Sequence, residues 1–222
     1  MKDSGVDWLG EIPAHWEAKR LKNVSTFVTS GSRGWAEFYS DEGPLFLRIG
    51  DIQSASIDLN IDDVQHVDPP RGSEGERTRV KSGDVVISIT ALIGAVAVVR
   101  EDLPEAFVNQ HLALIRLSTS AVDSRWIAYC IMSRVGQTQF AADLYGGTKD
   151  GLGLEDVRSL LVLAPPISEQ ERIVAYLDSQ GAKLTKLVQS VRSAIDYLRE
   201  FRSALISAAV TGKIDVREAA RR

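Results

Sequence analysis

The sequence has little cysteine and no long apolar run. Cys130 is the one cysteine among 222 residues, which excludes an internal disulfide framework and suits a reducing cytoplasm. No stretch approaches the roughly 18 consecutive apolar residues of a membrane-spanning helix, and the first residues lack the apolar segment of a secretory signal. We therefore expect a cytoplasmic protein that does not associate with a membrane.

The sequence also lacks a recognisable catalytic constellation. Its three histidines are scattered along the chain, at His15, His66 and His111. None of them stands at metal-ligand spacing from a cysteine or a carboxylate. Asp68-Pro69-Pro70 is similar to the Asp-Pro-Pro-aromatic signature of amino-methyltransferases, but Arg71 follows where the aromatic residue would stand. Around Gly147 the residue order of a phosphate loop is missing. We therefore expect no enzyme activity, no metal and no bound cofactor.

An excess of basic residues is missing as well. The formal net charge is −4. Residues 1–167 contain 16 Lys/Arg against 23 Asp/Glu, giving −7, whereas residues 168–222 contain 10 against 7, giving +3. A nucleic-acid-binding domain usually shows a basic patch or stripe. This balance counts against DNA binding by the N-terminal part unless its basic residues gather locally.

Short apolar runs rich in β-branched residues are present throughout residues 1–165, and they are typical of strands. They cover residues 45–49, 85–89, 95–99, 107–108 and 112–117. Apolar residues at helical spacing predict one helix over about 126–140, and proline and glycine predict a polar loop over 68–76. Many short strands with few helices predict an α+β domain with a curved β-sheet.

A long helix is predicted after Pro165 and Pro166, because a residue before proline is pushed out of the α region. Ser168 is a candidate N-cap, with Glu171 completing a capping box. Heptad periodicity then runs to about residue 209. Position a holds Leu177, Leu184, Val191, Leu198 and Leu205, and position d holds Ile173, Gln180, Leu187, Ala194, Phe201 and Ala208.

Periodicity sustained over about five heptads predicts a coiled coil. Roughly 42 helical residues would extend about 60 Å, which is too long for the apolar stripe to be buried against one small domain. We therefore predict residues 166–212 as a dimerisation helix and residues 213–222 as a tail. The alternative is an amphipathic helix packed on the core of its own domain.

Basic side chains gather in loops that glycine and proline keep exposed. The candidate DNA-binding residues in these loops are Arg33, Trp35, Arg71, Arg77, Arg79, Lys81, Thr148 and Lys149. Arginines on loops suit phosphate binding and guanine recognition, and hydroxyls add hydrogen bonds to base edges or phosphate. The alternative is that residues 71–81 form a solvated loop in which the basic side chains pair with Glu74 and Glu76.

An ordered set of short phrases runs through nearly the whole chain. They are Trp8–Glu17 followed by Arg20-Leu21, Arg48–Ile52, Gly83–Ser88, Asn109–Leu112, Gly147–Leu152, Pro165–Ile167, Glu169–Asp178 and Ala204–Val216. Together they resemble the DNA-specificity (S) subunit of type I restriction–modification systems. The ordered set is far more specific than any one phrase.

The resemblance implies a non-catalytic subunit that reads double-stranded DNA and carries two methyltransferase (M) subunits, with a restriction (R) subunit joining for cleavage. S-adenosylmethionine would then be bound by the M subunit and not by this chain. A full S subunit has two recognition domains and two long helices that pack antiparallel. This sequence resembles a half-length form, with one recognition domain and one helix.

The half-length pattern and the heptads both require a second chain. We therefore predict homodimerisation through an antiparallel coiled coil and a bipartite palindromic DNA target, with Gln180 helping to fix the register. Within the family, the alternative is pairing with a different S chain. Outside it, the alternative is a coiled-coil dimeric scaffold whose globular domain binds another protein and does not read DNA.

Overall fold

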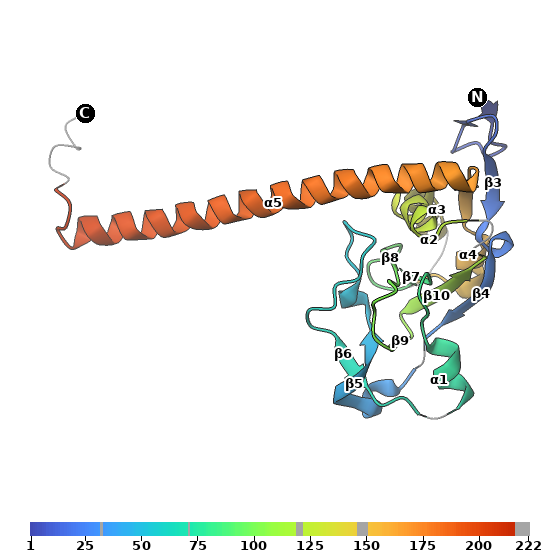
Figure 1. The fold of residues 1–222 in the computed structure, drawn as a ribbon, viewed down its shortest axis with the longest axis horizontal. Helices are drawn as coiled ribbons and strands as arrows, with labels where there is room; N and C mark the ends of the chain where they lie inside the picture. The colour runs from blue at the N-terminus through green and yellow to red at the C-terminus, as the bar shows by residue number, and fades with distance from the viewer. Residues whose placement is uncertain (32, 71, 119–121, 146–150, 216–222) are drawn as a thin grey trace. The chain divides into compact units, whose positions relative to one another are not determined.

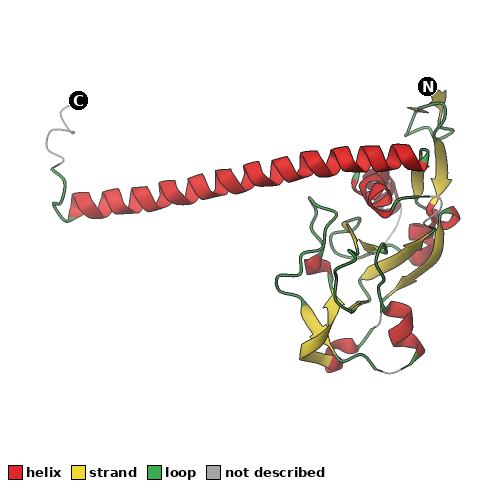
Figure 2. Cartoon of the chain, viewed as in Figure 1, coloured by secondary structure: helices red, strands yellow, loops and turns green. Residues whose placement is uncertain are grey.

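The computed structural model describes residues 1–31, 33–70, 72–118, 122–145 and 151–215. The chain divides into two compact units, Met1–Val174 and Ala175–Arg222. One helix, α5 (Ile167–Val210), contributes its first residues to the first unit and the rest to the second (Figure 1). The first unit mixes strands and short helices (Figure 2), which confirms the predicted α+β class.

The centre of the first unit is a four-stranded antiparallel sheet in the order β4-β10-β7-β8. Its strands are β4 (Ser25–Ser30), β7 (Val85–Ser88), β8 (Val96–Val98) and β10 (Leu112–Leu117). Successive side chains point to opposite faces of a strand. In β7, Val85 and Ile87 join one hydrophobic cluster and Val86 joins another. Both faces are covered, which explains why these strands are continuous apolar runs in the sequence.

The remaining strands of the described residues form three smaller sheets. One of them contains β5 (Tyr39–Leu47), β6 (Gln65–Val67) and β9 (Ala106–Val108). Its strand order is β6-β5-β9, and β5 pairs antiparallel with β6 and parallel with β9. The two-stranded sheets are antiparallel and consist of β1 (Lys2–Asp3) with β2 (Glu11–Ile12), and β3 (Glu17–Arg20) with β11 (Leu161–Ala164).

The helices of the first unit are short. They are α1 (Ser73–Thr78), α2 (Ser124–Met132), α3 (Arg134–Tyr145) and α4 (Leu154–Ser159), with 3-10 turns η1 (Leu21–Asn23), η2 (Trp35–Phe38) and η3 (Ile49–Asp51). The single helix predicted over 126–140 is therefore wrong. Ser133 has extended backbone, and its hydroxyl donates to the carbonyl of Cys130 (2.7 Å) and accepts from the amide of Val135 (3.1 Å), which separates two helices. The loop predicted over 68–76 is also wrong in part, because α1 begins within it.

The α2 helix packs on the central sheet and contributes Trp126, Ile127 and Cys130 to the larger hydrophobic cluster. The Asp123 side chain caps its first turn by accepting from the amide of Trp126 at 2.8 Å. Burial raises the pKa of the Cys130 thiol to about 12, so the thiol stays protonated at neutral pH. Among the described residues, no helix has the length and apolarity needed to cross a membrane.

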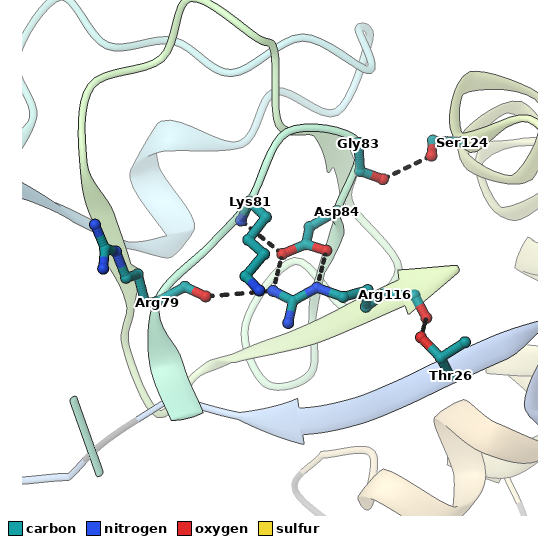
Figure 3. Close-up of polar contacts among 7 residues, drawn as sticks. All are labelled: Thr26, Arg79, Lys81, Gly83, Asp84, Arg116 and Ser124. Carbon is teal, nitrogen blue, oxygen red and sulfur yellow. Dashed lines mark hydrogen bonds and ion pairs between the residues drawn. The ribbon is translucent and has the colours of Figure 1, made fainter. Parts of the chain in front are cut away.

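A buried ion pair fixes the turn that leads into β7 (Figure 3). The carboxylate of Asp84, 1% exposed, accepts two hydrogen bonds from Arg116, at 2.9 and 2.6 Å, and one from the amide of Lys81, at 2.7 Å. The Arg116 guanidinium also donates to the carbonyl of Arg79 (3.4 Å) and lies over the ring of Phe27. Bidentate geometry with further hydrogen bonds is the arrangement in which a buried pair is stabilising.

Asp84→Ala is expected to lower the free energy of unfolding by about 3 kcal/mol, because Arg116 and the Lys81 amide lose their shared acceptor. Urea unfolding followed by tryptophan fluorescence measures this, since all four tryptophans lie in the first unit. Asp102→Ala is the matched control. It breaks the ion pair between Arg100 and Asp102, whose side chains are 47% and 74% exposed, respectively. The free energy of unfolding should fall by only about 0–1 kcal/mol. Equal losses in the two variants would contradict the assignment.

Candidate DNA interface and pairing helix

Four strands of the first unit end at a common edge. The parallel pairing of Leu47 in β5 with Val108 in β9 puts the segments that follow these strands side by side. Both neighbours of β10 run antiparallel to it, so the ends of β4 and β7 lie beside its beginning. Three backbone hydrogen bonds join the segments: Gly31 N–H to Leu112 C=O (3.2 Å), Asn109 N–H to Leu47 C=O (3.0 Å) and Ile89 N–H to His111 C=O (3.0 Å). We call this edge the rim; it is formed by Gly31, Arg33, Arg48, Ile89–Ile93 and Asn109–His111.

Two glycines allow the rim segments to approach closely. A Cβ atom on Gly31 would lie 2.0 Å from the carbonyl oxygen of Val108, and one on Gly151 would lie 2.6 Å from that of Ile89. The amide of Leu152 donates to the same Ile89 carbonyl at 2.8 Å. The segment that begins at Gly151 therefore packs against the rim, and no larger residue fits at these two positions.

Polar side chains form a hydrogen-bonded chain along the rim. The ring of His111 lies between two partners, with Nδ1 3.1 Å from the hydroxyl oxygen of Thr90 and Nε2 3.1 Å from the amide nitrogen of Gln110. The Asn109 side chain accepts from the amide of His111 at 3.0 Å. All four residues are partly exposed. Amide, hydroxyl and imidazole groups held in this way offer both donors and acceptors to a ligand.

The structure separates the predicted basic residues that it describes, which do not all lie at the rim. Arg77 donates to the carbonyl of Ser30 at 2.7 Å and to the Thr29 hydroxyl, so it lies at the rim end of β4. Arg79 pairs with Glu105 at 3.0 Å, which shows a different partner from the acidic residues predicted for it. Its side chain points away from the Asp84–Arg116 pair (Figure 3).

Lys81 lies beside Asp84 at the beginning of β7, away from the strand end that contributes to the rim. Arg33 is exposed and follows β4 at the rim. Arg71, Thr148 and Lys149 lie outside the described residues.

The predicted exposure of Trp35 is wrong. The side chain is 3% exposed and belongs to a small core with Phe46, Val67 and Phe107. Its ring stacks on that of Phe46, with centroids 5.7 Å apart and an interplanar angle of 21°. The 3-10 turn η2 carries the ring inward directly after the exposed Arg33 and Gly34. Trp35 therefore supports the rim from inside and is not available to stack on a base.

The second unit consists largely of α5, a continuous 44-residue helix when its first turns are included. Its large apolar side chains are exposed at the predicted a and d positions: Leu184 (63%), Leu187 (61%), Val191 (51%), Leu198 (67%), Phe201 (66%) and Leu205 (48%). Val188 and Ile195, at the neighbouring e position, are also exposed. Within the described part of the second unit, nothing covers this stripe.

The first turns of α5 are bound tightly to the first unit. Gln170 is fully buried; its amide nitrogen donates to the carbonyl of Pro165 (2.7 Å) and its side-chain oxygen accepts from the amide of Asp123 (2.9 Å). Glu169 accepts from His15 at 2.8 Å, and this hydrogen bond lowers the pKa of the Glu169 carboxyl below its ordinary value. Together these bonds anchor the first turn of α5 within the first unit.

The helix begins earlier than predicted. The carbonyl of Pro166 accepts from the amides of Glu169 (2.8 Å) and Gln170 (3.1 Å), and the helix starts at Ile167. Ser168 therefore lies inside the first turn and is not the N-cap. Proline suits this place because it has no backbone N–H, and the first N–H groups of a helix have no acceptor within the helix.

Among the described residues, no three His, Cys, Asp or Glu side chains lie close enough together to hold a metal ion. The arrangement instead combines an edge with donors and acceptors and a helix with an uncovered apolar stripe. Residues 13–195 match the family model described as the type I restriction modification DNA specificity domain. The chain belongs to this family.

The relatives that this chain matches are longer than the chain itself. The type I restriction enzyme EcoBI specificity subunit of Escherichia coli is 23% identical over 207 residues, covering 91% of this chain and 43% of its own length. A chain from a structure on the complex assembly and conformational transition of the type I R-M system has a TM-score of 0.69 and 21% identity, over 90% of this chain and 47% of that one.

The HsdS subunit from Thermoanaerobacter tengcongensis has a TM-score of 0.56 and 23% identity, over 80% of this chain and 40% of that one. These likenesses show that the fold is shared, a mixed α+β unit followed by a long helix. The chain spans about half the length of the relatives it matches.

Gln170→Ala is expected to lower the free energy of unfolding by about 2 kcal/mol, because a buried donor and a buried acceptor lose their partner. Hydrogen exchange at the Asp123 amide should accelerate in parallel, which tests the bond itself. Gln189→Ala is the matched control, since Gln189 lies exposed in the middle of the same helix. Unchanged exchange at Asp123 would contradict the role given to Gln170.

Proposed function

We propose that this chain is the non-catalytic DNA sequence-recognition subunit of a type I restriction–modification complex. The family match over residues 13–195 supports the assignment, and the rim supplies the hydrogen-bonding groups that base recognition requires. In this proposal residues 1–165 read double-stranded DNA, residues 166–212 pair with a second chain and residues 213–222 are a tail. The single observation that carries it is the uncovered apolar stripe of α5, the helix that follows a domain of this family in the chain.

The second chain is a second copy of this one. Leucine, valine and phenylalanine side chains that are about half to two thirds exposed would each gain on the order of 1–2 kcal/mol by burial in a seam. A two-fold contact between identical helices is isologous, so one stripe serves both protomers. An antiparallel arrangement places one recognition domain at each end of the pair. Gln180, at a d position, helps to fix the register of the seam.

The DNA target follows from the symmetry. Two identical domains related by a two-fold axis read two inverted half-sites with an unspecified spacer, separated by about one turn of the double helix or more. Arg33 and Arg77 at the rim, with Arg71, Arg79, Lys81, Thr148 and Lys149, remain the basic and polar contacts proposed for bases and phosphates.

The acidity of residues 1–167, with a net charge of −7, requires help from other subunits. Phosphate contacts dominate affinity for DNA, and acidic residues outnumber basic ones in this part of the chain. A partner methyltransferase subunit would supply this grip and bind S-adenosylmethionine, and a restriction subunit would join for cleavage. In this proposal the cofactor and the catalytic groups belong to the partner subunits and not to this chain.

Selection from a pool of random-sequence duplexes tests the function, using this chain alone and with a co-expressed type I methyltransferase subunit. Enrichment of two inverted half-sites at a fixed spacing supports the proposal. No enrichment in either condition would contradict it and would favour a coiled-coil scaffold that binds another protein.

Leu187→Asp should abolish the dimer, because a charge at a d position of the seam would be buried without a partner. Light scattering of the purified variant should give the mass of one chain, against two for the natural sequence. Gln189→Asp is the matched control, since it places the same charge on the same helix at heptad position f, outside the seam. A natural sequence that is monomeric at all concentrations would sink the homodimer proposal.

A further inference from the structure

Leu92 has an unusual backbone conformation at the rim. Its φ is +52°, and it is the one non-glycine residue with positive φ among those the structure describes. The left-handed region is rarely adopted by bulky side chains and costs on the order of 1 kcal/mol or more. The side chain gains no burial in return, because it is 57% exposed. Strained and exposed residues of this kind concentrate at binding sites.

The turn around Leu92 is held rigidly. The Ser88 hydroxyl donates to the carbonyl of Ala91, the amide of Gly94 donates to that of Ser88 (3.0 Å), and the amide of Ala95 donates to that of Leu92 (2.9 Å). Gly94 packs so closely on the ring of Phe140 that a Cβ atom would lie 2.5 Å from it. The surroundings therefore impose the conformation of Leu92 and present its side chain at a fixed place.

The Leu92 turn is joined to the turn that carries Gln110. Thr90 forms a bridge with Leu92 and a hydrogen bond with His111, and the other ring nitrogen of His111 contacts the amide nitrogen of Gln110. One N–H of the Gln110 amide is used by His111 in this arrangement. Its second N–H and its carbonyl oxygen have no hydrogen-bond partner among the described residues and form a donor–acceptor pair.

We propose that Leu92 and Gln110 together read one A·T base pair in the major groove. The free N–H and carbonyl oxygen of Gln110 match N7 and the N6 amino group of adenine, and the Leu92 methyl groups contact the 5-methyl group of the paired thymine. His111 is a positioning residue, because it holds Gln110 and connects it to the Leu92 turn. This inference rests on the proposed function and names the residues and the base pair.

The surroundings of Leu92 favour DNA over a protein partner. Protein interfaces are built around contiguous apolar patches with aromatic anchors. Among the described rim residues, Leu92 is the one large apolar side chain that is exposed, with the small Ala91 and the partly buried Ile93 on either side. The rim otherwise offers a hydroxyl, an imidazole and amides, and Arg33 and Arg48 follow the neighbouring strand ends. A single apolar contact among polar groups suits a thymine methyl next to hydrogen-bonding base edges.

The test uses the inverted-repeat duplex selected by the natural sequence, with each thymine replaced in turn by deoxyuridine. Leu92→Gly removes the side chain and relieves the strain, because glycine accepts positive φ. Thermal stability of this variant should be unchanged or higher. Its affinity should fall about three- to fivefold. At one thymine in each half-site, uracil should weaken the natural protein by the same factor and leave Leu92→Gly unaffected.

Gln110→Met keeps the length of the side chain and removes its hydrogen bonds. It should reduce the preference for adenine at the paired position by about fivefold to a hundredfold. Gln53→Met is the matched control, since Gln53 is exposed on a different loop, and it should leave the selected motif unchanged.

The outcomes separate this inference from the proposed function. If the natural sequence selects no motif, with or without a methyltransferase subunit, the proposed function fails and this inference with it. If it selects a motif that Leu92→Gly and Gln110→Met both retain, with the same sensitivity to uracil, only this inference is overturned. Circular dichroism of both variants must match that of the natural sequence, so a loss of motif with native spectra supports the contact.

Discussion

An uncovered apolar stripe on α5 is the constraint on which the rest depends. Leu184, Leu187 and Leu198 are each more than 60% exposed, on a helix that continues without a break from the tightly bound Gln170 to Val210. A stripe of this length stays in water only at a large cost in free energy. In the proposed dimer a partner helix covers this stripe, and the length of the seam would set how far apart the two attached domains are held.

The first unit satisfies a different constraint, which is to present polar groups at its rim from a core that is apolar on both faces of its central sheet. The rim achieves this by gathering four strand ends. Gly31 and Gly151 allow the backbone segments to touch, and the Asp84–Arg116 pair fixes the opposite end of β7. A rigid scaffold with ligand-facing groups on its loops is the usual division of labour in binding domains.

The sequence predicts well what depends on neighbours along the chain. The heptads of α5 and the apolar runs of β7 and β10 are local patterns, and the family resemblance rests on an ordered set of such segments. The break at Ser133 was missed because it depends on one hydroxyl that bonds to both flanking helices. The burial of Trp35 was missed because its small core is completed by Val67 and Phe107, which come from strands more than 30 residues away in the sequence.

The rim could not be predicted for the same reason. It exists because β5 and β9 pair in parallel across some 60 residues, and no local signal in either strand specifies that pairing. Asn109, Gln110 and His111 are noticeable in the sequence as a polar phrase, yet their connection to Thr90 needs the fold. The sequence gives no indication of the positive φ at Leu92, because leucine rarely adopts this conformation.

The distance between two spin labels on the helix tests the central claim most directly. With the buried Cys130 replaced by alanine, a label at Ser179→Cys would report on the exposed face near the start of the seam. Antiparallel pairing centred on Val191 separates the two labels by 24 residues along the axis, or about 36 Å. Pulsed electron resonance should therefore give a single distance near this value. No dipolar coupling, or a much shorter distance set by the width of the helix pair as in parallel pairing, would contradict the antiparallel arrangement.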